Sequence, residues 1–150
     1  MELRPATLGD IGVVLRHRRE MFREMGAEYA EQLNAFENAS REYFESALRD
    51  HSYYGLVGEM QGTVVAGGGV VIVPWPGSPR NLAPRRAWIL NIYVEPEHRR
   101  QGLARSILEA LIEWCKRNGF QSVALHASEQ GRPLYEKLGF RGTSEMRLTF

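Results

Sequence analysis

An amphipathic helix begins in the second half of the chain at Arg99-Arg100-Gln101-Gly102-Leu103-Ala104-Arg105, where three arginines surround a glycine. The start of a helix exposes unpaired backbone N–H groups and carries a partial positive charge, so cations placed there raise its energy. In the last turn of the same helix, Lys116 and Arg117 are favourably placed. A bound phosphate or carboxylate would offset the charge at the helix start. The stretch therefore indicates a site for an anionic ligand.

Strand patterns lie on both sides of this helix. Ala87–Val94 is mostly apolar and predicts a strand, and Ser122–His126 predicts another. Between them, apolar residues recur at helical spacing from Ala104 to Cys115, and Asn118-Gly119 supplies a C-terminal stop. Because a helical crossover connects the two strands, we expect them to be parallel.

The remaining sequence predicts a mixed α/β domain over residues 1–150, with no linker that would divide it. A long loop covers Pro74–Arg86. The other predicted elements are an extended start at Leu3–Ala6, a helix from Ile11 to Gly26, a helical region from Tyr29 to Asp50 broken near Asn38–Ser40, a hairpin of Tyr53–Glu59 and Thr63–Val73 around Gln61-Gly62, a short helix containing Leu134–Leu138, and extended segments from Phe140 to Phe150.

Composition narrows the class of protein. The 150 residues, 43% apolar and 25% charged, are typical of one soluble globular domain, and a net charge of +1 gives no general affinity for polyanions such as nucleic acid. The single cysteine, Cys115, excludes an internal disulfide, and the four histidines show no metal-ligand spacing. The sequence has no apolar stretch resembling a signal peptide or a membrane span. We therefore expect a cytoplasmic protein without a metal, a nucleic-acid partner or a membrane partner.

Two motifs resemble one protein family. Val94-Glu95-Pro96-Glu97-His98-Arg99-Arg100-Gln101-Gly102-Leu103-Ala104 looks like the acyl-coenzyme A signature of the GCN5-related N-acetyltransferase (GNAT) superfamily, whose core is R/Q-x-x-G-x-G/A. Leu134-Tyr135-Glu136-Lys137-Leu138-Gly139-Phe140 is similar to the family's Y-E-K-L-G-F ending. The resemblance implies a GNAT-like fold: a central mixed, twisted sheet of about six or seven strands flanked by helices, with splayed parallel strands forming the acyl-CoA cleft.

The resemblance also implies where acetyl-CoA, the expected cosubstrate, would bind. Small residues at Gly102 and Ala104 let main-chain N–H groups approach a pyrophosphate, and the neighbouring arginines could pair with phosphates. The strand Ala87–Val94 should carry a bulge, and its backbone near Ile92 and Val94 would hold the pantetheine arm. The expected coenzyme-binding residues are Ile92, Tyr93, Val94, Arg99, Arg100, Gln101, Gly102, Leu103, Ala104, Arg105 and Ser128.

One catalytic residue follows from the resemblance. The family's tyrosine stands near the coenzyme sulfur, so Tyr135 is the candidate general acid that protonates the departing thiolate. Ser128 and Gly131 depart from the asparagine and alanine that many members carry, which puts the contacts at this end of the cleft in question. The proton acceptor is left open between a water chain and the side chains of Glu20, Glu24, Glu28, Asn91, Tyr93 and His126.

The sequence thus predicts an acetyl-CoA-dependent N-acetyltransferase that acts on a small-molecule or peptide amine acceptor of unknown identity. A noncatalytic acyl-CoA-binding regulatory module is the alternative that keeps the pocket but not the chemistry. A nucleic-acid module would use the arginines of the first helix, which are better explained as a solvated face; these are Arg16, Arg18, Arg19 and Arg23. The resemblance also allows a homodimer.

Overall fold

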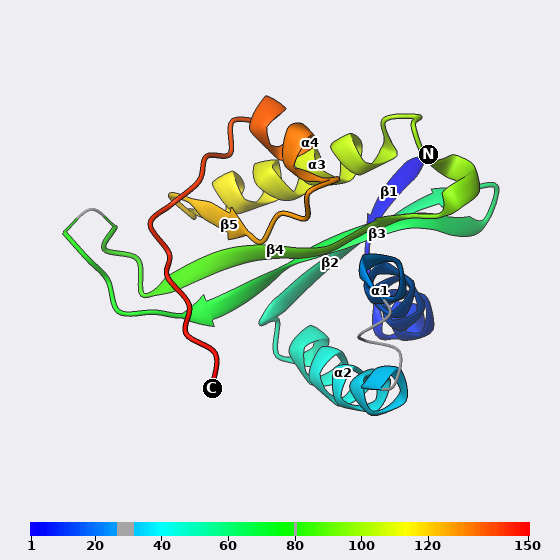
Figure 1. The fold of residues 1–150 in the computed structure, drawn as a ribbon, viewed down its shortest axis with the longest axis horizontal. Coiled ribbons are helices and arrows are strands. Elements are labelled where there is room, and N and C mark those ends of the chain that lie inside the picture. Colours follow the sequence, from blue (N-terminus) through cyan, green and yellow to red (C-terminus); the bar gives the residue numbers. More distant parts are fainter. Residues whose placement is uncertain (27–31, 80) are drawn as a thin grey trace.

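A five-stranded sheet forms the centre of the computed structural model, which describes residues 1–26, 32–79 and 81–150 (Figure 1). The strands follow sequence order across the sheet, with β1 to β4 antiparallel and β5 parallel to β4. The parallel pair confirms the expected strand–helix–strand unit. The strands are β1 (Glu2–Pro5), β2 (Tyr53–Met60), β3 (Thr63–Pro74), β4 (Arg85–Val94) and β5 (Val123–Leu125).

Helices cover both faces of the sheet. In Figure 1, α3 and α4 lie on one face while α1 and α2 lie on the other. Among the described residues, no helix is both long enough and apolar enough to cross a membrane. Short 3-10 turns precede α1 and α3. The helices are α1 (Ile11–Met25), α2 (Leu33–Arg49), α3 (Leu103–Arg117) and α4 (Arg132–Lys137), and the turns are η1 (Leu8–Asp10) and η3 (Pro96–His98).

The helix α3 anchors the larger of two hydrophobic cores. Its inward stripe of Ile107, Leu108, Leu111 and Cys115 is at most 2% exposed and packs against β2, β3 and β4. Burying each aliphatic side chain of this kind contributes roughly 1.5–3 kcal/mol to the free energy of unfolding. The predicted amphipathic helix is therefore confirmed, and its start is held firmly at one end of the sheet.

The expected break in the second helix is wrong. The helix α2 is continuous from Leu33 to Arg49, and Ser40 lies buried in its interior rather than at a cap. Leu33, Ser40, Phe44 and Ala47 form one buried stripe at helical spacing. Packing of this stripe against α1 and β2 outweighs the modest helix propensity of serine.

The sheet also has fewer strands than the six or seven expected. Residues 141–150 are exposed throughout and form no strand, with Met146 95% exposed and Leu148 76% exposed. An extended segment becomes a strand only when a neighbouring edge accepts its backbone hydrogen bonds, and no described strand pairs with this segment. The loop predicted at Pro74–Arg86 is shortened because Pro74 and Arg85 already pair across β3 and β4.

The N-terminal strand is tied to α1 through one buried carboxylate. Asp10 accepts hydrogen bonds from both terminal nitrogens of Arg4, each at 2.9 Å, and from the backbone N–H and hydroxyl of Thr7 at 2.8 and 2.9 Å. The Arg4 guanidinium, together with the Thr7 bonds, lowers the pKa of Asp10 from 3.8 to about 2. Asp10 therefore stabilises the turn that directs the chain from β1 into α1.

Replacing Asp10 by asparagine removes the negative charge that faces Arg4 and should lower the free energy of unfolding at pH 7 by about 1–2 kcal/mol. The loss is no larger because water screens the partly exposed Arg4. Since the pKa is lower in the folded protein than in the unfolded chain, the stabilisation is complete above pH about 4 and is lost as the pH falls toward 2. Urea unfolding of both proteins across this range measures the difference. A difference that stays constant down to pH 2 would contradict this role.

Candidate active site

The strand β4 carries the expected bulge. Tyr93 lies opposite Gly67 and Leu90 lies opposite Gly69, so Asn91 and Ile92 together face Gly68 alone. Asn91 has a φ of 59°, in the left-handed region that asparagine tolerates better than most residues. A Cβ at Gly68 would collide with the side chain of Ile92, so the glycine leaves the room that Ile92 occupies. The bulge thus turns Ile92 toward α3 and Asn91 toward α1.

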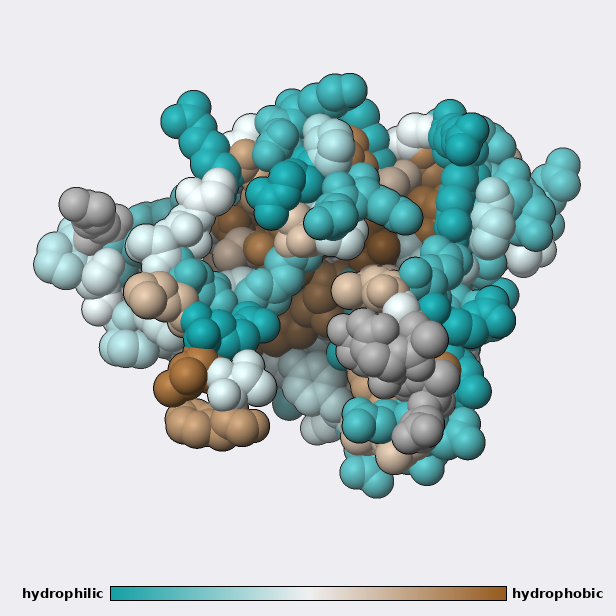
Figure 2. All heavy atoms as spheres, in the orientation of Figure 1, coloured by the Kyte–Doolittle hydropathy of each residue, from teal (hydrophilic) through white to brown (hydrophobic). Residues whose placement is uncertain are grey.

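The parallel strands separate beyond the bulge. Pairing of β4 with β5 runs only from Ala87 with Val123 to Ile89 with Leu125. Along residues 90–94, the edge of β4 that faces away from β3 has no partner strand among the described residues. Figure 2 shows this face of the molecule hollowed near its centre, with apolar side chains at the base of the hollow. The splay expected from the sequence is confirmed, and it leaves backbone groups available to a ligand.

The connection from β4 to α3 contains two residues in the left-handed conformation. Arg100 has a φ of 60° and Gly102, which precedes the first residue of α3, has a φ of 81°. A Cβ at Gly102 would meet no heavy atom within 4 Å. Glycine is therefore favoured here by backbone conformation, and the space in front of the helix start is open. An open helix start of this kind suits an anionic group.

Arg99 makes contacts that the sequence did not indicate. Its Nη2 lies 2.7 and 3.0 Å from the two carboxylate oxygens of Glu24, and its Nε donates to the backbone carbonyl of Val94 at 2.8 Å. The guanidinium carbon also stands 5.3 Å from the centre of the Tyr93 ring. In this structure Arg99 fastens α1 to the end of β4, so its expected role toward phosphate requires it to exchange or share Glu24.

The other two arginines of the motif differ in their partners. Arg105 pairs with Glu109 one turn later along α3, with 2.8 Å between Nε and Oε1. Arg100 is exposed and has no ion pair with any residue in the described part of the chain. The excess positive charge inferred at the helix start is therefore one arginine rather than three, because carboxylates from α1 and α3 neutralise the others.

Tyr135 lies on α4 and packs against the core that contains Val94 and Ile107. Burial raises the pKa of its hydroxyl above the ordinary value of 10. A Cβ at Gly131 would stand 2.8 Å from the ring, so this glycine lets the backbone come close to Tyr135. Ser128 accepts a hydrogen bond from the Gly131 N–H at 3.1 Å, which engages its hydroxyl in the turn before α4; the N-cap of α4 is Gly131.

The structure does not single out a proton acceptor. Glu28 lies outside the described residues, and the described residues contain no cluster of three or more His, Cys, Asp or Glu side chains that could hold a metal ion. Each of the remaining side chains is already engaged: Glu20 with Arg23, Glu24 with Arg99 and the Tyr93 hydroxyl, Asn91 with Arg18, and His126 with the Trp88 ring and Arg147.

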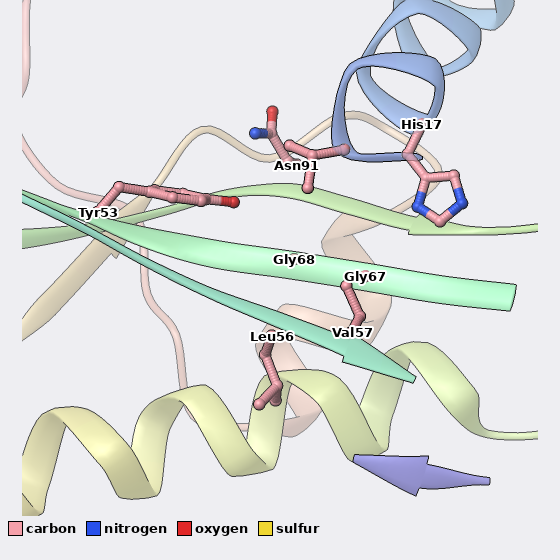
Figure 3. Close-up of a pocket in the computed structure, with 8 residues that line it drawn as sticks. His17, Tyr53, Leu56, Val57, Gly67, Gly68 and Asn91 are labelled. Atoms are coloured by element: carbon pink, nitrogen blue, oxygen red, sulfur yellow. The ribbon is translucent and has the colours of Figure 1, made fainter. Parts of the chain in front are cut away.

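His17 is a buried residue of the site that the sequence analysis missed. It is 3% exposed on α1, and its Nε2 lies 3.1 Å from a carboxylate oxygen of Glu95. Burial lowers the pKa of His17, although Glu95 opposes this shift, and this favours the neutral imidazole. Figure 3 shows it directed from α1 toward β3 near Gly67. The sequence did hold a signal for this burial, because His17 follows Val14 by three residues on the buried stripe of α1.

The arginines of α1 do not form a uniform solvated face. Three of them pair with a carboxylate: Arg16 with Glu95, Arg19 with Glu37 and Arg23 with Glu20. Arg18 instead turns inward, where its Nη1 donates to the Asn91 side chain. The neutralised cations weaken the nucleic-acid hypothesis, and the inward arginine corrects the surface role first given to Arg18.

A family model described as the acetyltransferase (GNAT) family matches residues 16–140, which is well over half of the chain. The chain belongs to this family. The crystal structure of a GCN5-related N-acetyltransferase from Ralstonia eutropha JMP134 superposes with a TM-score of 0.93 at 37% identity, covering 99% of this chain and 97% of that one. A predicted acetyltransferase from Clostridium acetobutylicum, solved with acetyl-CoA, gives a TM-score of 0.83 at 25% identity over 99% and 95%.

The matches to sequence relatives in the GNAT family cover different shares of each protein's length. It is 29% identical to thialysine N-epsilon-acetyltransferase of Sus scrofa, over 95% of this chain and 85% of that protein. It is 39% identical to glucosamine 6-phosphate N-acetyltransferase of Trypanosoma brucei brucei over 40% of this chain. The matches span less than half the length of the curated relatives that head the comparison, with 32% of human N-acetyltransferase 8 and 42% of the trypanosome enzyme.

Proposed function

We propose that this chain is an N-acetyltransferase that transfers acetyl from acetyl-CoA directly to an amine acceptor. The observation that carries the proposal is the bulged end of β4, which leaves β5 and leads through the left-handed turn into the open start of α3. The free edge of β4 and the start of α3 could therefore both contact a single extended ligand. An amide-containing arm ending in a pyrophosphate matches both parts.

The residues present fit this cosubstrate. The edge of β4 from Ile92 to Val94 that faces away from β3 would bind the pantetheine amides, and the segment Arg99–Arg105 would bind the phosphates through its N–H groups and Arg100. Ser128, placed beside Tyr135 by Gly131, would border the same cleft. The thioester supplies an acetyl group activated toward nucleophiles.

The proposed reaction needs one proton acceptor and one proton donor. The neutral amine nitrogen forms a bond to the acetyl carbonyl carbon, and the carbon–sulfur bond breaks. A backbone N–H at the bulge would stabilise the developing oxyanion. The Tyr135 hydroxyl gives its proton to the departing thiolate, while water accepts the proton that the amine loses. The products are the acetylated amine and the free thiol of coenzyme A, and solvent returns a proton to Tyr135.

An acid role for Tyr135 predicts an alkaline limb in the pH profile. Because burial raises the pKa of Tyr135, the hydroxyl stays protonated through the neutral range, and kcat should fall only above pH about 10. Steady-state rates at saturating acceptor, measured between pH 7 and the alkaline stability limit, test this. A limb centred near pH 8 would assign the titration to another group.

The experiment that tests the proposal incubates the full chain with acetyl-CoA and a panel of primary amines. The panel includes glucosamine 6-phosphate and thialysine, the acceptors in the names of two relatives. We expect free thiol and acetylated amine to appear in equal amounts. Tight acetyl-CoA binding without turnover on any amine would favour the noncatalytic acyl-CoA-binding regulatory module, and absence of binding would overturn both readings.

A further inference from the structure

Arg18 differs from the other described arginines of α1 because it has no carboxylate partner. Arg16, Arg19 and Arg23 each lie within ion-pair distance of a glutamate, as described above. Arg18 has no ion pair with any residue in the described ranges, and its Nη1 donates a hydrogen bond to the Asn91 amide oxygen at 2.5 Å. A partly buried cation therefore lies beside the bulge of β4 without a matching anion.

The surroundings of Arg18 are apolar and largely shielded from water. Its guanidinium carbon lies 4.9 to 5.5 Å from the centres of three phenylalanine rings, those of Phe22, Phe36 and Phe44. Burial lowers the pKa of Arg18, because removing water disfavours the charged form. Aromatic faces attract a cation but replace only part of its hydration. Holding a positive charge at this location costs free energy that a purely structural role does not explain.

Two hydrogen-bond donors at this place lack partners. The Nε of Arg18 and the Nδ2 of Asn91 are both buried, and neither makes a hydrogen bond. With Nη1 engaged by Asn91, the side of the guanidinium formed by Nε and Nη2 is unused. That side presents two parallel N–H donors, the arrangement that binds the two oxygens of a carboxylate.

The position of Asn91 connects this cation to the proposed chemistry. Asn91 is the left-handed residue of the β4 bulge, and its side chain lies on the α1 side of the sheet, where the Tyr53 hydroxyl points toward it (Figure 3). The bulge is also where the proposed oxyanion contact lies. Beyond Arg18, Phe22 and Phe36 line a cavity of about 220 Å³ together with Gln32 and Leu33. Arg18 thus contacts both the rings that line this cavity and Asn91 at the bulge.

We infer that Arg18 binds a carboxylate of the acceptor, so that the acceptor is a small amine that also carries a carboxylate group. This inference rests on the proposed function and names its substrate class. The carboxylate occupies the Nε and Nη2 donors of Arg18 next to the Asn91 amide, and the amine of the same molecule faces the acetyl group at the bulge. The carboxylate would supply the anionic partner that Arg18 lacks.

Matched acceptors test the inference on the unmodified protein. A series of α-, β- and ω-amino acids is compared with the carboxamide of each, which keeps the shape and the amine but removes the negative charge. We expect kcat/KM to favour at least one free acid over its amide by on the order of 10–100-fold, the size expected for one charge-assisted pair. Equal rates for acids and amides, or preference for an amine that carries a phosphate, would overturn the inference while leaving the proposed function standing.

Two variants at Arg18 connect the preference to this side chain. Arg18→Gln should raise the KM of the preferred acid by on the order of 10–100-fold, leave the amide's KM unchanged and preserve acetyl-CoA affinity. Arg18→Lys keeps the charge without the two parallel donors and should fall between the two proteins. Arg19→Gln on the same helix, already paired with Glu37, is the matched control and should keep the wild-type preference.

The outcomes separate the inference from a structural role and from the proposed function. If Arg18 were only structural, Arg18→Gln would change the kinetics of acids and amides equally, and this would overturn the inference. If Arg18→Gln unfolds, a loss of the acid preference in the folded Arg18→Lys protein decides instead. If the wild-type chain binds acetyl-CoA but acetylates no amine, the proposed function fails and the inference fails with it.

Discussion

Replacing Tyr135 by phenylalanine should lower kcat about 100-fold and leave the Kd for acetyl-CoA unchanged. The departing thiolate then takes its proton from water rather than from a positioned hydroxyl, and positioned acids contribute roughly 10²–10⁴-fold to rate. The lower end is expected because a thiolate is a good leaving group. Phenylalanine keeps the ring that packs against the core and stands 6.0 Å from Phe140, so α4 should hold its place.

The matched control for this substitution is Tyr54→Phe. Tyr54 is also a partly buried tyrosine packed against the same core, where it stacks on Trp114 with 4.2 Å between ring centres. Tyr54 lies on β2, which has no assigned role in the chemistry, so the kcat of Tyr54→Phe should match that of the wild type. A single-turnover measurement ensures that the acetyl-transfer step is observed. A wild-type rate for Tyr135→Phe in that measurement would remove the acid role.

The second large effect is expected at the start of α3, where Gly102→Glu should weaken acetyl-CoA binding by on the order of 100-fold or more. The new side chain enters the open space in front of the helix and brings a negative charge to the place proposed for a pyrophosphate. Isothermal titration calorimetry measures the Kd directly. An unchanged Kd would refute the placement of the phosphates.

Gly119→Glu provides the control for backbone strain. Gly119 has a φ of 77°, close to the 81° of Gly102, and a Cβ there would also meet no heavy atom within 4 Å. Both substitutions place a β-carbon in the left-handed region at a similar cost of roughly 1–2 kcal/mol. Because Gly119 follows the opposite end of α3, its variant should show the same loss of thermal stability with full affinity for acetyl-CoA.

Much of the structure at the proposed donor half of the site could be predicted from the sequence, because its signals are local. Gly102 favours a left-handed backbone, the apolar stripe after it indicates a helix, and the helical crossover makes β4 and β5 parallel. Each of these follows from neighbouring residues along the chain. Two of the errors, a break near Ser40 and additional strands after Phe140, arose where packing or strand pairing decides the structure.

The proposed acceptor half could not be predicted from the sequence, because its residues meet only through the fold. His17 pairs with Glu95 across 78 positions, and Arg18 reaches Asn91 across 73. Along the sequence, Arg18 is one of four similar arginines, and nothing local distinguishes the one that turns inward. The way α1 packs against α2 and β4 turns Arg18 inward, where it loses contact with water and has no carboxylate partner.

The sequence by itself determined the family, the coenzyme motif and the helix that this motif begins, since those depend on backbone conformation and periodicity within a few residues. Only the tertiary structure decided how the charges are matched. It joined Arg99 to Glu24, left Arg100 exposed at the helix start and enclosed Arg18 among aromatic rings. The reason is physical: the energy of a charge depends on the water and the partners around it, and the fold determines both.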